Sequence, residues 1–427
     1  MAEIKPFRGI LYSRNKVDIE KVVTPPYDVI SRKMQDRFYH NDPHNIIRLI
    51  LGRAERSDTK KNNKYTRAGK FLSKWLKDGI LAKDRKPSIY VYTQEYLHKG
   101  KKRTRMGFVA LMKIEDPRES GVLPHEYTLA KPKEDRLNLI GRTKANSSPI
   151  FSLFQDPENK VNKILKSFTD KTGPLFLLET EGVIHKIWRI DKKSAVLRIQ
   201  SIMRGKKIFI ADGHHRYEVA LAYRNAMGKR KGLKNSMNYV MMYFSNLSER
   251  GNLTILSTHR VIRYPGGTSG KKIKSKLRKY FDIKKVKTIE KLFEYLEKIP
   301  RKKHAFGIYA GKGIFYLLSL KSAYPVAKLP LGSGKTYSLK KLDVTILHDL
   351  IIDKLLGVKN TESIIKYIRN EKDAGVLVDK GDYNLAFFLR PTDIMEMKAV
   401  AERGEMMPQK STYFYPKLLT GLVVNKF

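Results

Sequence analysis

The sequence predicts an α/β protein with α+β features, built around a mixed sheet, and three observations carry this prediction. Strand-like, hairpin-like and helix-like segments mix along the whole chain. The 427 residues suggest two or three domains, and with 41% hydrophobic and 10% aromatic residues the chain can bury sizeable cores. No repeat with a period of 20–50 residues is visible. The chain is therefore expected to be globular and non-repetitive.

Hydrophobic periodicity and chain breakers place the elements of the first half. The prolines of TPPYDV keep 24–29 extended or in a turn, and Ser31 is a candidate N-cap for the helix that follows. Helices are predicted at 31–39, 63–78 and 132–142, strands at 4–12, 46–51 and 148–154, and a hairpin at 88–97 and 106–114.

The second half alternates in the same way. An apolar run with i, i+4 and i+8 spacing predicts a strong amphipathic helix at 340–356. A helix, strand, helix, strand and strand are expected in that order between 271 and 319. Further elements are helices at 192–203 and 214–227, and strands at 206–211, 240–245 and 255–263.

The chain has no Pro/Gly/Ser-rich linker that divides it cleanly. We expect an N-terminal α/β region over 1–265, which carries the Asp-Gly-His-His-Arg turn, and a C-terminal α/β region over 266–427. Within the second region, the segment 404–421 is expected to return to the site formed by the first.

Several protein classes are excluded or disfavoured by composition. The absence of cysteine excludes disulfides, thiolate catalysis and Cys-ligated zinc within this chain. The N-terminal segment lacks a long apolar stretch, and no run approaches about 18 consecutive apolar residues. We therefore expect no signal peptide, no membrane partner and a cytoplasmic location.

The charge is strongly basic, with 86 Lys+Arg against 42 Asp+Glu and a formal net charge of +44. Such an excess attracts polyanions, among them nucleic acids, nucleotides and phosphorylated metabolites. A lysine-rich composition selected for heat tolerance is the alternative. The basic residues occur in runs that usually decorate turns or solvated helix faces, at 99–105, 229–234, 271–279, 284–287 and 301–304.

The most informative stretch is Ala-Asp-Gly-His-His-Arg, in which a short apolar strand ends and a helix begins. The first N–H groups of a helix have no intrahelical partners, and Gly213 lets an anion approach them. His214, His215 and Arg216 add side-chain donors, which suits a phosphate or a carboxylate. Asp212 is placed to orient an imidazole or to act as a base.

Two other interpretations of this stretch stay open. Adjacent histidines on a helix point about 100° apart, so a metal site is disfavoured, because helical zinc ligands prefer i, i+4 spacing. The two histidines could also simply occupy a solvated helix start. We expect no metal ligated by the protein alone.

A second polar cluster lies in GEMMPQKSTYFYPKLLTG (404–421). Lys410, Ser411, Thr412 and Lys417 gather two charges and two hydroxyls, which could close an anion pocket or form a polar turn. By contrast, LGSGKT (331–336) resembles the end of a phosphate-binding loop but lacks the required glycine, strand and helix, so we interpret it as a flexible basic loop.

A third region carries further titratable residues. PHEYT and KEDRLNLIGRT bring His125, Glu126, Asp135 and Arg136 close together in the sequence. Glu126 and Asp28, the latter in TPPYDV, are candidate bases alongside Asp212.

These segments resemble successive landmarks of the family called domain of unknown function 1015. The landmarks span almost the whole chain in order, and they are PFRGI (6–10), TPPYDVIS (24–31), NIIRL (45–49), ADGHHRYEVAL (211–221), THRVI (258–262), LDVTILHDLII (342–352) and MPQKSTYFYPKL (407–418). The family's name implies no function.

The Asp-Gly-x-x-Arg turn between strand and helix is also similar to the nucleotide-binding turn of the ParB/sulfiredoxin superfamily, whose free-serine kinases carry a similar Asp-Gly-His-His-Arg turn. This resemblance implies a ParB/sulfiredoxin-like nucleotide-binding core with additional α/β elements. It implies that Gly213, His214, His215 and Arg216 bind nucleotide phosphates, and that Asp212 lies at the reacting centre. About fifteen residues carry it.

The sequence thus leads to a hypothesis with two alternatives. The leading one is a nucleotide-dependent phosphotransferase, a small-molecule kinase that acts on a hydroxyl metabolite such as serine. Asp212, Asp28 or Glu126 would take the hydroxyl proton, and the cluster at 410–412 would neutralise developing charge. Mg²⁺ with ATP, ADP or CTP is expected by resemblance. The alternatives are a nucleic-acid-binding or nucleotide-sensing protein of ParB type and a non-enzymatic metabolite-binding protein.

Overall fold

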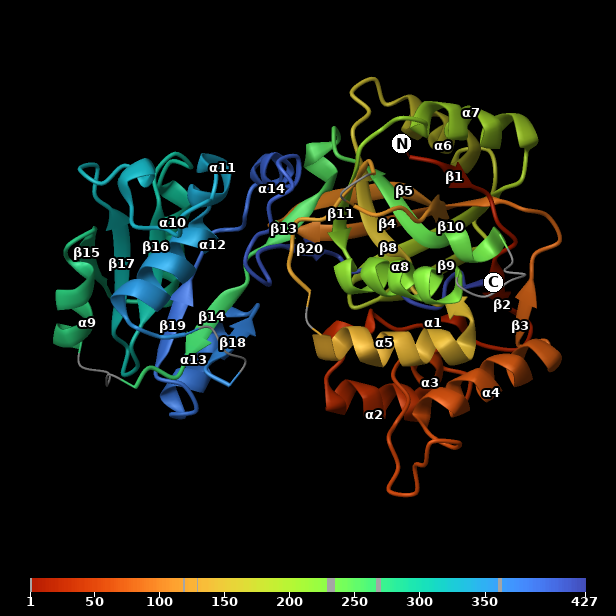
Figure 1. Ribbon diagram of the computed structural model, residues 1–427, viewed down its shortest axis with the longest axis horizontal. Coiled ribbons are helices and arrows are strands. Elements are labelled where there is room, and N and C mark those ends of the chain that lie inside the picture. The colour runs from red at the N-terminus through yellow and green to blue at the C-terminus, as the bar shows by residue number, and fades with distance from the viewer. Residues whose placement is uncertain (1, 118–119, 129, 229–234, 266–269, 360–362) are drawn as a thin grey trace. The chain divides into compact units, whose positions relative to one another are not determined.

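The computed structural model describes residues 2–117, 120–128, 130–228, 235–265, 270–359 and 363–427. The chain forms two compact units, each with its own sheet (Figure 1). The first unit comprises Met1–Pro124, Thr128–Thr254 and Pro416–Phe427, and the second comprises His125–Tyr127 and Ile255–Tyr415. The division expected from the sequence, into an N-terminal region over 1–265 and a C-terminal region over 266–427, stays a prediction. Of the described helices, none has the length and apolar character needed to cross a bilayer.

A nine-stranded mixed sheet organises the first unit. Its order is β6-β11-β8-β12-β5-β4-β10-β9, with β1 paired to β5. β11 runs parallel to β6, and β12 runs parallel to β8, while the other pairs are antiparallel. The expected mixed α/β architecture is confirmed. The strands are β1 (Ile4–Lys5), β4 (Ile89–His98), β5 (Lys101–Lys113), β6 (Val122–Leu123), β8 (Ile150–Phe154), β9 (Phe176–Thr180), β10 (Val183–Ile190), β11 (Ile208–Asp212) and β12 (Tyr239–Asn246).

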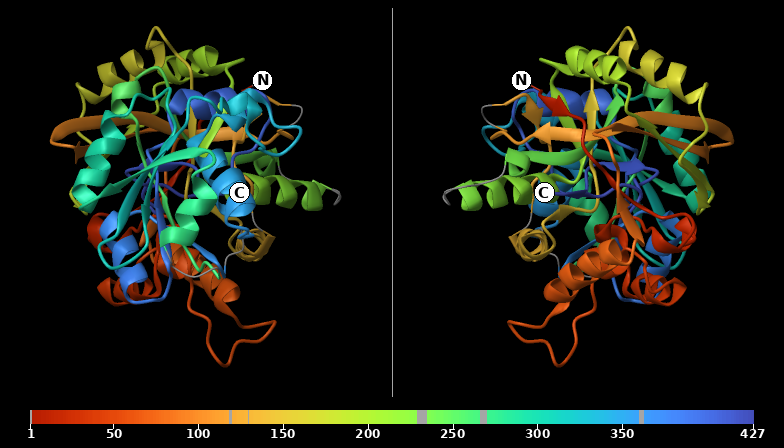
Figure 2. Two further views of the ribbon diagram at one scale, coloured as in Figure 1. Left: turned by 90° about the vertical axis from the view of Figure 1, so that its left-hand side faces the viewer. Right: turned by 90° about the vertical axis from the view of Figure 1, so that its right-hand side faces the viewer.

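The helices of this unit share one core with the sheet. α6 (Lys160–Thr169), α7 (Lys193–Met203) and α8 (His214–Gly228) bury apolar side chains such as Leu165, Ile199 and Tyr217 in one cluster with residues of the strands. α5 (Ala130–Thr143) packs against α8, as Figures 1 and 2 show. A second core gathers the N-terminal helices around Trp75 and Val424. The remaining elements of the unit are β2 (Ile10–Tyr12), β3 (Leu81–Lys83), β7 (Ala145–Asn146), β21 (Asn425–Lys426), α1 (Ile19–Val22), α2 (Arg32–Asn41), α3 (Ile47–Ile50), α4 (Lys64–Lys77) and the 3₁₀ turns η1 (Tyr27–Val29), η2 (Asn235–Asn238) and η3 (Arg250–Asn252).

Local signals in the sequence predicted much of this unit. Ser31 caps α2 by accepting a hydrogen bond from the Met34 N–H at 3.3 Å, as expected. The strand expected at 46–51 is wrong, because this stretch forms the short helix α3. Its apolar side chains are buried, and a short apolar run does not distinguish a buried strand from a buried helix. The strand expected at 4–12 is interrupted and forms β1 and β2.

A six-stranded sheet of order β15-β17-β16-β19-β14-β18 organises the second unit. α10 and α13 pack on it through buried side chains such as Leu292, Leu296 and Val378. The strand expected at 255–263 is split between β13 and β14. The six strands of this sheet are β14 (His259–Ile262), β15 (Phe281–Val286), β16 (Ala305–Tyr309), β17 (Phe315–Leu320), β18 (Ile365–Ile368) and β19 (Leu385–Phe388). β13 (Thr254–Leu256) and β20 (Tyr413–Tyr415) pair as a separate two-stranded sheet.

The amphipathic helix expected at 340–356 takes an unusual form. α12 (Asp343–Thr345) passes directly into a ten-residue π-helix, η5 (Ile346–Leu355). π-helical segments are rare and often occur at functional sites. The other helices of the unit are α9 (Gly270–Leu277), α10 (Ile289–Lys298), η4 (Val326–Lys328), α11 (Tyr337–Lys340), α13 (Glu371–Asp379) and α14 (Ile394–Ala401).

Candidate functional site

The Asp-Gly-His-His-Arg segment forms the strand–turn–helix that the sequence predicted. β11 ends at Asp212 after a register shift against β8, and the fifteen-residue helix α8 begins at His214. Gly213 between them has φ +95°, a backbone conformation that favours glycine. A Cβ at this position would lie 2.9 Å from the Arg216 guanidinium. The turn therefore requires glycine for both its conformation and its space.

Asp212 is held by two cations at this turn. Its Oδ2 lies 2.7 Å from Arg216 Nη2, and its Oδ1 lies 2.5 Å from Lys417 Nζ. The three side chains are largely buried, at 17%, 13% and 11% exposed for Asp212, Arg216 and Lys417. Two positive charges thus share one carboxylate beside a helix N-terminus, and the cluster keeps a net positive charge that favours an anion.

A buried polar network in the sheet fixes the position of Lys417. Gln94 Nε2 donates to the Lys417 carbonyl oxygen at 2.9 Å, and the buried Arg105 guanidinium donates to the Pro416 carbonyl. The Leu419 N–H donates to the Tyr92 hydroxyl at 3.2 Å. Three side chains of β4 and β5 therefore hold the backbone on both sides of Lys417.

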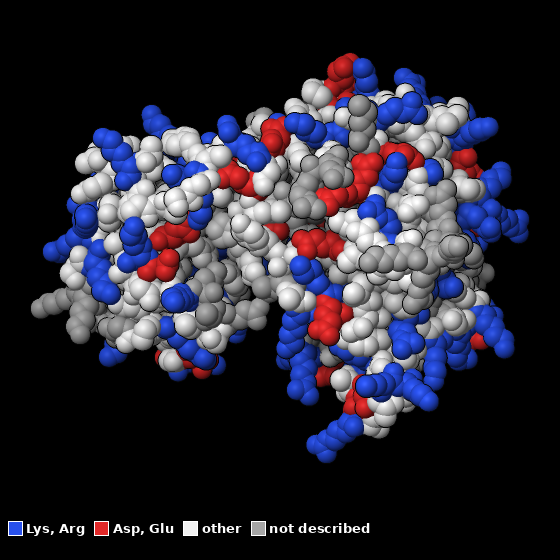
Figure 3. Space-filling view, in the orientation of Figure 1, with Lys and Arg blue, Asp and Glu red and all other residues white. Residues whose placement is uncertain are grey.

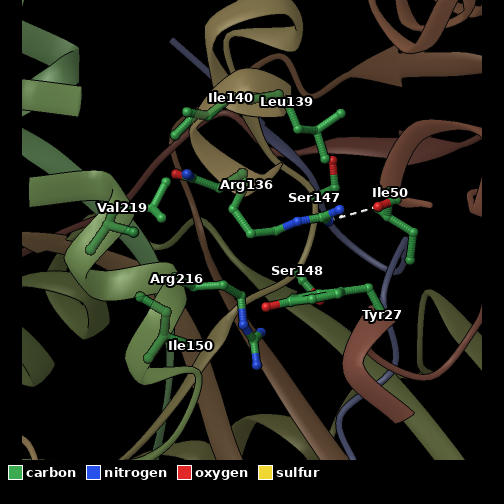
Figure 4. A pocket seen from close by; sticks show the side chains of 13 residues that line it. Tyr27, Ile50, Arg136, Leu139, Ile140, Ser147, Ser148, Ile150, Arg216 and Val219 are labelled. Carbon is green, nitrogen blue, oxygen red and sulfur yellow. Dashed lines mark hydrogen bonds between the residues drawn. The ribbon is translucent and has the colours of Figure 1, made fainter. Parts of the chain in front are cut away.

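A small cavity of about 70 Å³ opens beside the turn (Figure 4). The Arg136 guanidinium lies 4.1 Å from the centre of the Tyr27 ring and donates to the Ile50 carbonyl oxygen at 2.6 Å. Figure 4 shows Tyr27 between Arg136 and Arg216. The lining combines polar and apolar side chains, and it comprises Tyr27, Ile50, Arg136, Leu139, Ile140, Ala145, Asn146, Ser147, Ser148, Ile150, Arg216, Val219 and Val240.

The electrostatics of this region couple the cavity to the turn. Burial raises the pKa of the Tyr27 phenol, and the charges of Asp28, Arg136, Arg216 and Asp212 also act on it. Tyr27 therefore lies within the field of the Asp212 cluster, although TPPYDV is far from that cluster in the sequence.

Asp135 anchors Arg136 from its other side. Its carboxylate accepts hydrogen bonds from Lys64 Nζ at 2.7 Å, Tyr65 Oη at 2.8 Å and Arg136 Nε at 3.0 Å. Burial acts to raise the pKa of Asp135, but Arg136 and the hydrogen bonds outweigh it and lower the pKa to about 2. Asp135 is thus a structural anion that orients a cavity arginine.

The two histidines occupy successive positions at the start of α8. His214 is 7% exposed and His215 is half-buried. Among the described residues, no group of three or more His, Cys, Asp and Glu side chains is arranged to hold a metal ion. Their predicted roles in phosphate binding stay predictions.

The predicted site residues fall into both units. The first unit contains Asp28, Asp212–Arg216 and Lys417, while the second contains Glu126 and the 410–412 cluster. Asp28 is exposed on η1, next to Tyr27. The structure thus joins Lys417 to the predicted turn, and the assembly of all these residues into one pocket stays a prediction.

The predicted residues of the second unit contact one another. The Lys410 N–H donates to Glu126 Oε1 at 2.9 Å, and His125 Nε2 lies 3.0 Å from Thr412 Oγ1. The Ser411 hydroxyl donates to the Pro408 carbonyl oxygen. Lys410 itself is exposed with φ +55°, so its side chain lies at the surface of this unit.

The basic residues are dispersed on the one face of the molecule that Figure 3 shows. On the face shown in Figure 3, Lys and Arg side chains spread over both units with acidic side chains among them. The run at 99–105 forms the tip of the β4–β5 hairpin, as expected, with Lys99 and Gly100 at positive φ. The run at 229–234 lies outside the described residues.

Tyr27 and the network behind Lys417 were missed by sequence reasoning. Arg136 was noted only as part of a polar stretch. A proline-rich turn with an aromatic residue is one signal that could have indicated Tyr27. Nothing in the sequence pairs Lys417 with Asp212, which stands 205 residues earlier in the chain.

Comparison with known proteins places these observations in context. The family model described as protein of unknown function (DUF1015) matches residues 4–345. No curated protein matches the chain.

Among solved structures, a conserved hypothetical protein from Pyrococcus furiosus is similar over 73% of this chain and 92% of its own, with 14% identity and a TM-score of 0.34. A free serine kinase in complex with AMP is similar over 72% and 86%, with 13% identity and a TM-score of 0.34. SbnI with C-terminal truncation from Staphylococcus aureus is similar over 73% and 85%, with 12% identity and a TM-score of 0.34. Likenesses at this TM-score carry no argument about function.

Proposed function

This chain belongs to the DUF1015 family of unknown function, and from that premise we propose that it is a nucleotide-dependent phosphotransferase acting on a small hydroxyl compound. The observation that carries the proposal is the cluster of Arg216 and Lys417 around Asp212 at the start of α8. The proposal includes a ParB/sulfiredoxin-like core, which rests on the similarity of the turn.

The cluster provides the two groups that phosphoryl transfer requires. Transfer is catalysed mainly by positioning and by stabilising the charge on the phosphoryl oxygens. The α8 N-terminus, Arg216 and Lys417 supply donors and positive charge for phosphates, and Asp212 supplies a carboxylate within contact of both cations. Phosphates bound here would compete with Asp212 for these cations and free the carboxylate to accept a proton.

The proposed step conserves atoms and charge. The substrate hydroxyl oxygen forms a bond to the terminal phosphorus of a nucleoside di- or triphosphate. The bond from that phosphorus to the bridging oxygen breaks, and the shortened nucleotide leaves with that oxygen. The hydroxyl proton passes to the Asp212 carboxylate. Asp28 and Glu126 stay alternative acceptors of this proton.

Mg²⁺ fits this site as a companion of the nucleotide rather than as a resident ion. The described residues contain no cluster of three or more metal-ligating side chains. Mg²⁺ commonly binds through substrate phosphates with one or two carboxylates, and Asp212 is a carboxylate at this position. When bound, Mg²⁺ supplies charge neutralisation for the phosphates.

The proposal is tested by assaying the purified chain with Mg²⁺, ATP, ADP or CTP, and a panel of hydroxyl metabolites that includes serine. Phosphorus NMR is expected to show a new phosphate ester and the shortened nucleotide. Asp212→Asn should reduce the rate by about 10²–10⁴-fold, the usual contribution of a general base. Asp78→Asn, which changes an exposed aspartate of the same unit, is the control. Absence of transfer across the panel would count against the proposal.

The Asp212→Asn variant also distinguishes a phosphotransferase from a non-enzymatic metabolite-binding protein. If the chain only binds a metabolite, Asp212→Asn would change its affinity for that metabolite, and the wild type would show no turnover.

The nucleic-acid alternative is motivated by the net charge of +44. It predicts binding that weakens steeply between 50 and 200 mM salt, roughly 10³–10⁵-fold for six to ten phosphate contacts. Binding that is insensitive to salt would eliminate it.

A further inference from the structure

A second and larger pocket lies entirely within the second unit, and it is independent of the proposed phosphotransferase site. Its volume is about 840 Å³, within the range of small-molecule binding sites. The π-helix η5 forms one wall, the 333–335 loop another and the 404–408 segment a third. The pocket is therefore large enough for a small molecule, and one of its walls is the π-helix η5.

The loop that resembles a phosphate-binding motif lines this pocket but is already neutralised. The Lys335 ammonium pairs with the Asp349 carboxylate of η5. Glu405 Oε1 accepts from the Thr336 N–H at 2.8 Å, and its other oxygen accepts from the Thr336 hydroxyl. Carboxylates of the chain thus occupy the Lys335 ammonium and both donors of Thr336, which a bound phosphate would need.

The charge of the lining is opposite in sign to that of the chain. Three carboxylates, those of Asp349, Asp353 and Glu405, line the pocket together with two ammonium groups, Lys335 and Lys359. The chain as a whole has about twice as many basic as acidic residues. Asp353 is exposed and has no side-chain hydrogen bond or ion pair within the described part of the chain. An ammonium group would complement it.

A buried histidine adds a directional polar contact. His348 lines the pocket and is 6% exposed. The Arg260 Nε, on a fully buried guanidinium, donates to His348 Nε2 at 3.1 Å. Burial, together with Arg260, lowers the pKa of His348 to about 3, so the ring is neutral near pH 7.

The tautomer of His348 follows from that hydrogen bond. Because Nε2 accepts, the ring proton must reside on Nδ1. Nδ1–H has no hydrogen-bond partner among the described residues. Nδ1 is not among the fully buried unpaired atoms and His348 lines the pocket, so an acceptor atom of a ligand can take the place of water at this donor.

We propose that this pocket binds a small organic amine that also carries an oxygen acceptor, such as an amino alcohol or an amino amide. Its ammonium group pairs with Asp353 and its oxygen accepts from His348 Nδ1. The aliphatic side chains of the lining, among them Leu339, Ile352 and Val358, contact its carbon skeleton. The site distinguishes amines from phosphorylated compounds because Glu405 and Asp349 repel an anion and occupy the loop donors.

The test is isothermal titration calorimetry of the full chain at pH 7 with ethanolamine, serinol and lysinamide, and with pyrophosphate and ATP as anionic probes. At least one amine is expected to bind saturably. Asp353→Asn should weaken it about tenfold or more, the value of a charge-assisted hydrogen bond. Asp382→Asn, an exposed aspartate of the same unit outside the pocket, should leave the affinity unchanged.

A second variant separates this site from an anion site. Lys335→Gln should leave amine binding intact or strengthen it, because a positive charge is removed beside the ligand. Saturable binding by none of the amines would overturn the proposal. Binding of pyrophosphate or ATP that Lys335→Gln abolishes, with Asp212→Asn as the reference for the first unit, would also overturn it.

Discussion

The two glycine turns at 213 and 334 look alike in the sequence, and the structure separates them by what surrounds the glycine. At Gly213 two cations share one carboxylate at the start of a fifteen-residue helix. At Gly334 the neighbouring Lys335 and Thr336 are each paired with a carboxylate, and only the four-residue helix α11 follows. The comparison teaches that two glycine turns can carry opposite charge balance, and that contacts with distant parts of the chain set this balance.

The largest expected difference lies in removing the central carboxylate of each turn. Asp212→Asn should lower the free energy of unfolding of the first unit by about 3 kcal/mol, because it leaves two largely buried cations without their counter-charge. Asp349→Asn should lower the free energy of unfolding of the second unit by about 1 kcal/mol or less, because Lys335 is more exposed and can reach water. Hydrogen exchange of the α8 and η5 amides measures each effect in its own unit. Equal losses would refute the contrast, and Asp78→Asn serves as a surface control.

The next effect concerns the two lysines predicted to bind phosphate. Lys417→Gln should weaken binding of ATP or pyrophosphate about 10–100-fold, since it removes a charged donor at 2.5 Å from Asp212. Lys410→Gln should change the affinity less than twofold, because the Lys410 side chain is exposed and its interaction with an anion is screened by water. Calorimetric titration gives both values. Comparable losses would instead support one pocket served by both lysines.

A smaller difference is expected from adding a methyl group to each glycine. Gly213→Ala should lower the free energy of unfolding by about 2 kcal/mol. A left-handed backbone costs an L-residue about 1–2 kcal/mol, and the new Cβ would also displace the Arg216 guanidinium. Gly334→Ala should cost about 1 kcal/mol, because φ is +83° but the Cβ meets no atom within 4 Å. Thermal unfolding of the two variants compares them. If Gly334→Ala lowered the stability more than Gly213→Ala, the Arg216 guanidinium would have to move aside at little cost.

The smallest effect is the acid dependence of the cavity beside the first turn. The folded pKa of Asp135 is about 2, below its unfolded value near 4, so its contribution to stability is present above pH 4 and lost as the pH falls toward 2. After allowance for partial exposure, we expect about 1 kcal/mol. Denaturant unfolding of the wild type and Asp135→Asn across pH 2–5 measures it. An unchanged pH profile in the variant would contradict this assignment.

The elements whose signals lie within a few residues of one another could be predicted from the sequence. The Ser31 cap, the 99–105 hairpin tip and the strand–glycine–helix turn at 213 depend on residues within a few positions of one another. Asp212 ends β11 and Arg216 lies in the first turn of α8, so the short turn between them brings the two side chains together. The interpretation of 331–336 as something other than a phosphate-binding loop rested on the missing strand and helix.

Other features depend on contacts between distant parts of the chain. The segment 46–51 was predicted as a strand because a short apolar run does not distinguish a buried strand from a buried helix, and here four of its apolar side chains are buried in the helix α3 and at its start. Lys417 meets Asp212 across 205 residues only because Gln94, Tyr92 and Arg105 hold its backbone. The allotment of 410–412 to the second unit likewise follows from long-range packing.

The sequence by itself determined the mixed α/β class, the strand–glycine–helix turn at 213 and the basic charge, because composition and short-range spacing encode them. The tertiary structure decided which cations reach Asp212, that Tyr27 and Arg136 border the cavity, and that acids neutralise the loop at 334. The physical reason is that charge pairing acts over a few ångströms in space, and chain spacing does not report which distant side chains come that close.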